Sequence, residues 1–227
     1  MDGTMAVLIL TATAPLLATG STQAAGTTPA STEGDQLRGT YGPYRANNDL
    51  LYYHLDLRVD PEKKYISGQN TIRFNMLTDG TRIQLELLPV FHIEKILLDE
   101  AAGKTTALQY QRAAGRTLFI DSPHTLKSGK TYTIEFYYSG NPVEIGRFGG
   151  FVFRKDPSGR PLVNTACEEE GAASVWWPNK DQWRDEVEDM DISVEPPSDL
   201  VEVSNGRFQG KTYPKAIHLE LEGPLLD

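Results

Sequence analysis

The sequence predicts an all-β fold, mainly an antiparallel β-sandwich or saddle. First, apolar and polar residues alternate from about Asp49 onward, which is the period of a strand with one buried face. Second, about seven such segments follow one another at spacings of roughly 8 to 15 residues, separated by Gly, Pro, Asp or Asn. Third, no segment has a helical period beyond a turn or two near 181–190. Together these observations argue against alternating β and α units.

The first two predicted strands form a hairpin. In LLYYHLDLRVD the odd positions from Leu51 to Val59 are apolar, and Asp60 and Pro61 end the pattern. The segment YISGQNTIRFNM, residues 65–76, then resumes the alternation. Because the D-P-E-K-K connection between them is short, the two segments predict a β-hairpin.

Five later segments show the same alternation. In KTYTIEFYYSG, the side chains of Tyr132, Ile134, Phe136 and Tyr138 share one face. The other segments are TRIQLELLP (81–89), HIEKILLD (92–99), ALQYQR (107–112) and RTLFIDS (116–122). The strands therefore predict one β domain, to which we assign residues 48–213.

The residues on either side of this domain have a different composition. Residues 26–47 begin GTTPASTEGDQLRGT and predict a disordered linker, because they carry too few apolar groups to offset the entropy of ordering. Residues 214–227 predict a truncated or atypical tail, since HLELEG could form one more strand but PLLD does not resemble the end of a domain. We therefore expect a gene fragment, a premature stop or an expressed domain.

Residues 1–25 predict a signal peptide. The apolar run MAVLILTATAPLLA is too short to span a bilayer, and small residues follow it through Ala24 and Ala25, as a signal-peptidase site requires. No Lys or Arg precedes the run, and Asp2 has the wrong sign for the start of a signal peptide. The alternatives are a disordered tail or a misassigned start codon upstream of Met5. We expect a secreted or periplasmic protein with no membrane span.

Charge and cysteine content argue against several classes of partner and site. The chain has 22 Lys and Arg against 31 Asp and Glu, a formal net charge of -9, and no basic cluster, so we expect no nucleic-acid partner. Cys167 is the chain's one cysteine, which excludes an intrachain disulfide framework and a Cys-rich zinc site. Any metal would need His and carboxylate ligands.

The segment NTACEEEGAASVWWPNKD, residues 164–181, holds the candidate binding residues. If it is extended, Glu168 and Glu170 project from one face, about 7 Å apart. Such a pair suits a cation, because mutual repulsion is costly unless something positive lies between the carboxylates. The cation could be a substrate ammonium group, a metal or an arginine of a neighbouring domain. The alternative is a solvated edge of a sheet.

The two tryptophans of this segment are adjacent. In an extended chain, one of Trp176 and Trp177 faces inward and the other outward, and Pro178 restricts Trp177 to extended conformations. Tryptophans are more often core residues than binding platforms. We nevertheless expect at least one indole to be exposed or to lie at a domain interface.

At this point the sequence resembles a known family. CEEEGAASVWWPNKD, followed from Met190 by MDISVEPPSDLVEVSNG, is similar to the signature of the N-terminal domain of the aminopeptidase N family of zinc metallopeptidases, which includes leukotriene hydrolase and many secreted bacterial enzymes. YHLDLRVDPEKKYISGQNTIRF resembles the opening hairpin of that family, and YTIEFYYSGNP the strand before the signature. The resemblance covers about residues 48–206.

The resemblance implies a saddle-like β domain that packs on a thermolysin-like catalytic domain. In the family, an acid or glutamine on the signature strand helps to bind the free α-amine of the substrate, and the matching position is Glu168. A carboxylate near a primary ammonium gains a charge-assisted hydrogen bond. We assign Glu170 to the same substrate-binding site, and Trp176, Trp177 and Pro178 to the domain interface. Some members carry Gln where this chain has Ala166, which puts one substrate contact in doubt.

The zinc-binding motif of the family is absent from the sequence. Catalysis there needs H-E-x-x-H with a downstream Glu, whereas His54, His92, His124 and His218 are followed by Leu, Ile, Thr and Leu. The family's G-x-M-E-N element is missing too. We therefore expect no catalytic residues and no cofactor in this chain, no peptidase activity by itself, and zinc only in the full-length family enzyme.

Two functional hypotheses follow from these residues. The chain is either the amine-recognising, non-catalytic domain of an exported zinc aminopeptidase, or a free-standing β-sandwich module that binds peptides or glycans with an exposed Trp176 or Trp177. The first hypothesis predicts that Glu168→Ala matters only in the joined enzyme. The second predicts measurable ligand binding by the isolated chain.

Overall fold

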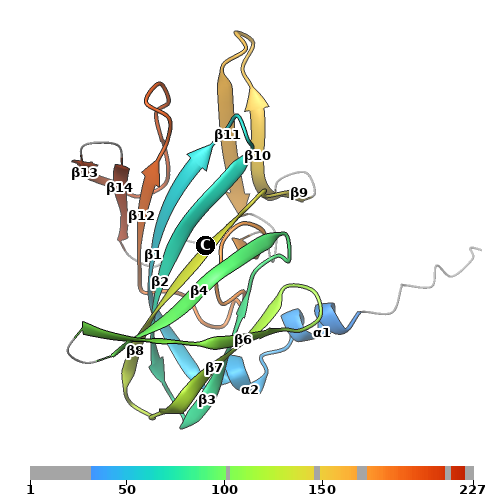
Figure 1. Cartoon of the computed structure of the whole chain (residues 1–227), viewed down its shortest axis with the longest axis vertical. Helices are drawn as coiled ribbons and strands as arrows, with labels where there is room; N and C mark the ends of the chain where they lie inside the picture. The colour runs from blue at the N-terminus through green and yellow to red at the C-terminus, as the bar shows by residue number, and fades with distance from the viewer. Residues whose placement is uncertain (1–31, 101–102, 146–148, 168–172, 213–215, 223–227) are drawn as a thin grey trace, which may run out of the picture. The chain divides into compact units, whose positions relative to one another are not determined.

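The computed structural model describes residues 32–100, 103–145, 149–167, 173–212 and 216–222 (Figure 1). All of them belong to one unit, Ser31–Asp227. Within these residues, strands dominate and most neighbouring strands are antiparallel. The prediction of an all-β, mainly antiparallel fold is therefore confirmed.

The largest sheet has eight strands, which can be followed in Figure 1. In spatial order they are β13 (Arg207–Thr212), β14 (Ala216–Glu222), β12 (Asp189–Glu195), β1 (Asn48–Asp60), β2 (Tyr65–Met76), β8 (Thr131–Gly140), β4 (Phe91–Glu100) and β5 (Lys104–Ala107). One pair departs from the antiparallel pattern, because β12 runs parallel to β1, with Leu55 opposite Ile192.

Two three-stranded sheets complete the described fold. One has the order β11 (Pro161–Cys167), β10 (Gly149–Lys155) and β9 (Glu144–Ile145). The other has the order β3 (Gly80–Glu86), β7 (Thr117–Leu126) and β6 (Gln109–Arg112). Buried residues of all three sheets belong to one hydrophobic cluster, so the small sheets pack on the large one through a shared core.

The hairpin predicted from the first two alternating segments is present as β1 and β2. Their register places Leu57 opposite Gly68 and Tyr53 opposite Ile72. A Cβ atom at Gly68 would lie 2.2 Å from the Asp56 carbonyl oxygen, so this close approach of the two strands requires glycine. Leu55, on the buried face of β1, has no exposed surface, as the alternation predicts.

Two helices lie within the range 26–47, for which we predicted a disordered linker. Residues Glu33–Gly39 form helix α1 and Pro43–Ala46 form helix α2. Arg45 of α2 is fully buried. The prediction of disorder is therefore wrong for these residues, since a long-range contact of Arg45, described below, orders a segment whose own composition is polar.

Two classes of feature are not found in the part of the chain that the structure describes. None of the helices there is long and apolar enough to cross a membrane. The His, Cys, Asp and Glu side chains there form no group of three or more that could hold a metal ion.

Candidate functional site

The predicted binding glutamates lie between two ordered elements. Strand β11 ends at Cys167, and the 3₁₀ helix η2 begins at Ala173 and ends at Val175. Glu168 and Glu170 fall outside the described residues, so their placement on one face stays a prediction. Before them, β11 pairs with β10, and Cys167 lies opposite Gly149. The backbone that leads into the glutamates is therefore fixed in a sheet.

The backbone that follows the glutamates is held at Ser174. Its carbonyl oxygen accepts a hydrogen bond from the Leu88 backbone N–H at 2.9 Å. Its hydroxyl donates to Asp181 Oδ2 at 2.8 Å and accepts from Arg116 Nη1 at 3.1 Å. Ser174 itself is fully buried. The segment that carries Glu168 and Glu170 is thus tied down at both ends.

Both tryptophans are buried within this chain, each with 8% of its surface exposed. The Trp176 ring packs against Phe151 with centroids 5.4 Å apart, and the Trp177 ring packs edge-on against Tyr53 at 4.9 Å. Of the two alternatives predicted for these residues, an exposed indole is wrong. A role at a domain interface stays a prediction.

The backbone conformation explains this difference. The segment is not extended, because the N–H groups of Trp176 and Trp177 both donate to the Ala173 carbonyl oxygen, at 3.1 and 3.2 Å. The turn brings the two indoles to one side, with centroids 6.1 Å apart. Pro178 is buried as well, and its carbonyl oxygen accepts a hydrogen bond from Asn70 Nδ2 at 2.8 Å. The alternative of a free-standing module loses its proposed aromatic platform.

Trp183 is the exposed indole of the described residues, with 73% of its surface accessible. Trp183 is not among the residues that the sequence predicts for the site. Its exposure could have been predicted, because Trp183 lies in the strongly charged stretch DQWRDEVEDMD, where no alternation indicates a buried face.

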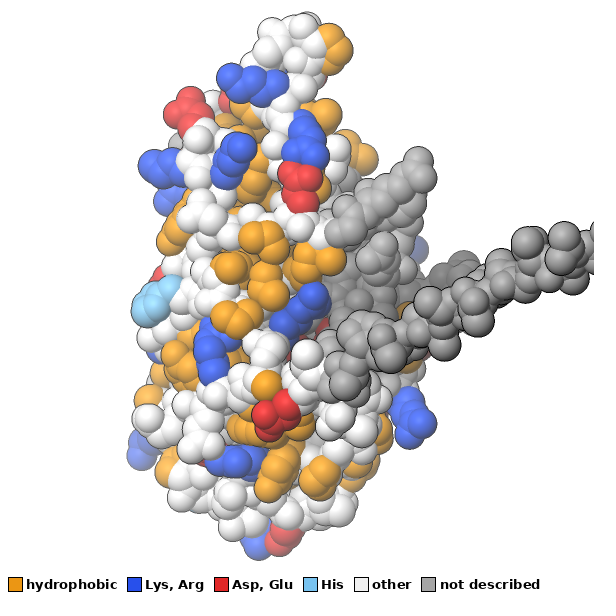
Figure 2. Space-filling model, turned by 90° about the vertical axis from the view of Figure 1, so that its right-hand side faces the viewer, with side chains coloured by type: hydrophobic (Ala, Val, Ile, Leu, Met, Phe, Trp, Pro, Cys, Tyr) orange, Lys and Arg blue, Asp and Glu red, His pale blue; other side chains and the backbone are white. Residues whose placement is uncertain are grey.

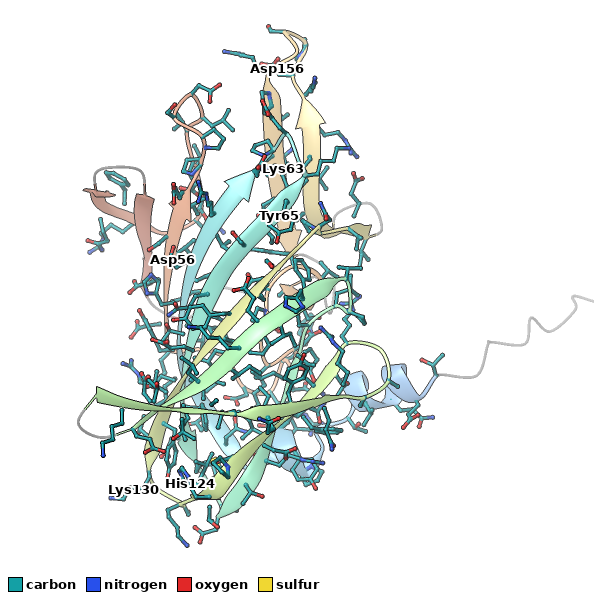
Figure 3. The ribbon with its side chains drawn as sticks, in the orientation of Figure 1. Asp56, Lys63, Tyr65, His124, Lys130 and Asp156 are labelled. Atoms are coloured by element: carbon teal, nitrogen blue, oxygen red, sulfur yellow. The ribbon has the colours of Figure 1, made fainter. Side chains whose placement is uncertain are left out.

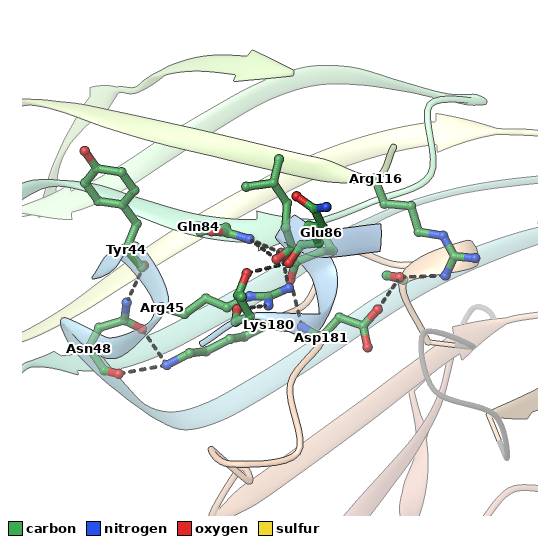
Figure 4. A network of polar contacts seen from close by, with 12 residues as sticks. Tyr44, Arg45, Asn48, Gln84, Glu86, Arg116, Lys180 and Asp181 are labelled. Carbon is green, nitrogen blue, oxygen red and sulfur yellow. Dashed lines mark hydrogen bonds and ion pairs between the residues drawn. The ribbon is translucent and has the colours of Figure 1, made fainter. Parts of the chain in front are cut away.

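A buried ion pair lies next to the residues that follow Pro178 (Figure 4). Arg45 Nη2 and Glu86 Oε1 are 2.6 Å apart, and neither side chain is exposed. Glu86 also accepts hydrogen bonds from Gln84 Nε2 at 2.8 Å and from the Asp181 backbone N–H at 2.9 Å. Burial raises the pKa of Glu86, while the Arg45 guanidinium acts in the opposite direction by favouring the carboxylate.

The same glutamate joins strand β3 to the residues after Pro178. The Glu86 N–H donates to the Asn179 carbonyl oxygen at 2.8 Å, and the Asn179 N–H donates to the Glu86 carbonyl oxygen at 3.1 Å. Side chain and backbone of one residue therefore both hold the 179–181 segment in place.

Lys180 forms the second buried charge cluster. Its ammonium group donates to the Asn48 carbonyl oxygen at 2.7 Å and forms an ion pair with Asp185. Asp185 also accepts a hydrogen bond from the Leu50 backbone N–H at 3.1 Å. Burial lowers the pKa of Lys180, and Asp185 opposes this effect. The cluster fixes the 180–185 loop on strand β1.

These contacts define what the site can do. The charged groups of Arg45, Glu86, Lys180 and Asp185 are paired with one another, so they support the backbone rather than face a ligand. The described residues on either side of the Glu168–Glu170 segment are therefore firmly held, and the role of its acids stays a prediction.

A family model matches most of the chain. The model described as the peptidase M1 N-terminal domain matches residues 50–216. This range contains β1 except its first two residues, the strands from β2 to β13, both tryptophans and the three consecutive glutamates. The comparison with curated proteins gave no match.

Solved structures share the fold. A two-domain M1 zinc metallopeptidase bound to L-arginine has a TM-score of 0.64 and 21% identity, over 79% of this chain and 40% of the other. An M1 zinc metallopeptidase from Deinococcus radiodurans has a TM-score of 0.62 and 18% identity, over 78% and 40% of the two chains. Yeast LTA4 hydrolase has a TM-score of 0.63 and 20% identity, over 79% and 27%. This chain therefore spans less than half the length of these similar proteins.

Proposed function

Because the chain belongs to the peptidase M1 N-terminal domain family, we propose that it is the β domain of a zinc-dependent aminopeptidase. In this proposal Glu168 binds the α-ammonium group of a peptide substrate, and Glu170 lies beside it in the same site. The partner is a catalytic metallopeptidase domain outside these 227 residues.

The observation that supports this role is the anchoring of the glutamate segment at both ends. Strand β11 fixes its entry through the pairing of Cys167 with Gly149, and Ser174 fixes its exit through three hydrogen bonds. A binding group is effective when its neighbours hold it in place before the ligand arrives. The two ordered anchors on either side of the acidic segment support this role.

The chemistry of the segment agrees with the recognition of a primary ammonium group. A carboxylate accepts a charge-assisted hydrogen bond from an ammonium, whereas an acylated amine carries no charge and a secondary ammonium has fewer N–H donors. The described residues do not fit a zinc site, because they hold no group of three potential ligands, and the sequence has no H-E-x-x-H. This chain's part in the reaction is therefore binding and orientation.

The proposed interface is supported by three buried residues, Trp176, Trp177 and Pro178. Because both indoles are buried, they stabilise the turn that follows the glutamates rather than contact the catalytic domain through an exposed ring. The exposed Trp183 lies in the next loop and is the described indole available to a neighbouring domain.

The test begins with the coding sequence downstream of codon 227, read in all frames for H-E-x-x-H and a distant Glu. The joined protein is then assayed on an aminoacyl amide with a free amine. Glu168→Gln should lower kcat/KM by about 10- to 100-fold, the effect of losing one charge-assisted hydrogen bond. Glu186→Gln, the same change at an exposed acid outside the segment, is the control. Equal activity of the two variants, or the absence of any catalytic motif downstream, would contradict the proposal.

We also propose export, which depends on residues 1–25 alone. Mass spectrometry of the mature protein should find an N-terminus shortly after Ala24 or Ala25. An intact Met1 in the mature protein would contradict export by a cleaved signal.

A further inference from the structure

The segment VEVS, residues 201–204, lies between β12 and β13, and the connection that contains it projects past the end of β12 (Figure 3). Val201 has 78% of its surface exposed and Val203 has 89%, the two highest values among the large hydrophobic residues that the structure describes. Valines that alternate along a strand usually face the core, whereas these two face solvent. The proposed role of Glu168 does not involve this segment, so the inference below is independent of it.

Exposed apolar side chains alone do not identify a docking surface. On the side of the molecule shown in Figure 2, on which β9 lies, hydrophobic side chains gather in several groups between charged and polar ones. Such groups are common, because much of the surface of a folded protein is apolar. A docking site for a strand has a further property, which is a row of backbone groups without partners.

Residues 201–204 have this property. Within the part of the chain that the structure describes, no hydrogen bond joins their backbone N–H and C=O groups to another residue. Before them, the Leu200 N–H donates to the Pro197 carbonyl oxygen at 3.0 Å and closes a turn. After them, Gly206 has a φ of +110°, which only glycine adopts readily. The segment thus lies between two turns, and its own backbone is free to pair.

Glu202 lies between the two valines and is less exposed than either of them. Its Oε2 atom is buried and has no hydrogen-bond partner among the described residues. Burial raises the pKa of this carboxyl group, because the charged form loses contact with water. In a β-sheet, residues directly opposite each other on neighbouring strands have side chains on the same face. A basic residue opposite Glu202 would therefore supply the missing partner.

We propose that residues 201–204 bind an extended strand of another polypeptide segment, in which a basic residue lies between two apolar ones. The two backbones pair, the basic side chain meets Glu202, and the apolar side chains pack on Val201 and Val203. The formal net charge of -9 on the chain also favours a partner that carries a basic strand.

The chain does not offer such a strand to itself or to a second copy. Residues 1–31 and 223–227 contain no Lys or Arg. The described strands hold an apolar–basic–apolar triplet at 57–59 and at 72–74, and both triplets are already paired between β1 and β2. Two copies of VEVS in symmetric antiparallel pairing would place Glu202 opposite Glu202, which is unfavourable. The occupant is therefore a different polypeptide segment.

The proposal is tested by adding acetyl-Thr-Val-Lys-Val-Thr-amide to the 227-residue chain and measuring amide hydrogen exchange by NMR. In the free chain the amides of 201–204 should exchange without protection. At saturation, alternate amides of the segment should exchange about tenfold or more slowly, because they become hydrogen-bonded. The same peptide N-methylated at Val, Lys and Val cannot donate these bonds and should give no protection. Amides already protected in the free chain, or no saturable binding at millimolar concentration, would overturn the proposal.

Glu202→Gln tests the charge. The wild type should bind the lysine peptide about tenfold more tightly than the same peptide with Glu in place of Lys, which opposes Glu202 with a like charge. Glu202→Gln should remove this preference, whereas Glu186→Gln, at an exposed acid elsewhere, should keep it. Circular dichroism confirms that both variants fold. A preference for lysine that is unchanged in Glu202→Gln would contradict the proposed pairing.

Val203→Thr tests the apolar contact. It keeps the shape and the strand preference of the side chain but makes it polar, so the affinity for the lysine peptide should fall about threefold or more. Val90→Thr, the same change at an exposed valine of another loop, should leave the affinity unchanged. Equal effects of the two substitutions would mean that the peptide does not lie on this segment.

Sedimentation velocity distinguishes a partner strand from a second copy of the chain. The chain without peptide should be a monomer at the concentration used for the titration. A dimer that Val203→Lys converts to a monomer would mean that the segment pairs with itself, and would overturn the proposed occupant.

Discussion

The guanidinium of Arg45 and the carboxylate of Glu86 are 2.6 Å apart, and neither side chain has any exposed surface. Arg45 lies on a four-residue helix before the first strand, and Glu86 ends strand β3. The pair therefore fastens the N-terminal segment to the core. Through the backbone of Asn179, it also fastens the segment that follows the two tryptophans.

Breaking this pair should destabilise the fold strongly. Glu86→Gln keeps the shape of the side chain but leaves the Arg45 charge buried without its partner, which should cost about 3–5 kcal/mol in the free energy of unfolding. Urea denaturation measures this. Asp121→Asn is the matched control, because it breaks the partly exposed pair with Arg82 and should cost about 0–1 kcal/mol. Similar losses in the two variants would show that the buried pair is not structurally important.

Lys180 should make stability depend on pH on the alkaline side of neutrality. Burial lowers its pKa in the folded protein, so between that lowered value and the ordinary value of about 10.4 the unfolded chain binds more protons than the folded protein. The contribution of Lys180 to the free energy of unfolding therefore rises with pH in this window. Urea denaturation between about pH 7 and pH 10 measures the free energy of unfolding of the wild type and of Lys180→Met. As the pH rises, the wild type should become more stable relative to the variant. A difference that is constant with pH would exclude the lowered pKa.

Tryptophan fluorescence should separate the three indoles of the chain. Because Trp183 is 73% exposed and the other two are 8% exposed, acrylamide should quench mainly Trp183. Trp183→Phe should remove most of the fluorescence that can be quenched, whereas Trp177→Phe should remove little of it. The opposite order would mean that Trp177 is accessible in solution.

Ser174 should contribute to stability through its hydroxyl. Ser174→Ala removes the hydrogen bond to Asp181 and the one from Arg116, which should cost about 1–3 kcal/mol in the free energy of unfolding because the group is buried. The control is Ser158→Ala, in an exposed turn, which should change stability by less than about 0.5 kcal/mol. Thermal unfolding of the two variants measures the difference. If Ser174→Ala behaves like Ser158→Ala, the hydroxyl does not anchor the end of the glutamate segment.

The strands could be predicted from the sequence because their signal is local. Alternation in the β1 and β2 segments identifies a buried face, and Leu55 and Ile72 are indeed buried on it. The parallel pairing of β1 with β12 could not be predicted in this way. More than 120 residues separate the two strands, and a pattern of period two does not state which strand pairs with which.

The features that the sequence did not predict depend on long-range contacts or on the geometry of a turn. Helix α2 is ordered by the contact of Arg45 with Glu86, and the composition of the N-terminal segment does not indicate this contact. The burial of both tryptophans comes from the turn at Ala173, which replaces the extended backbone on which the prediction relied. The choice of Glu168 and Glu170 as a cation-binding pair came from their spacing, their role in binding an amine came from the family resemblance, and both stay predictions.

The parallel pairing of β1 with β12 also sets an order of assembly. Strand β1 can pair with β2 as soon as the hairpin is synthesised, but its other edge stays open until Asp189–Glu195 has emerged. An open edge of this length is a template for pairing with another chain. A nascent or truncated chain that ends before Asp189 should therefore aggregate through β1. Residues 189–195 thus protect an interior strand of the sheet and do not simply add a strand at its edge.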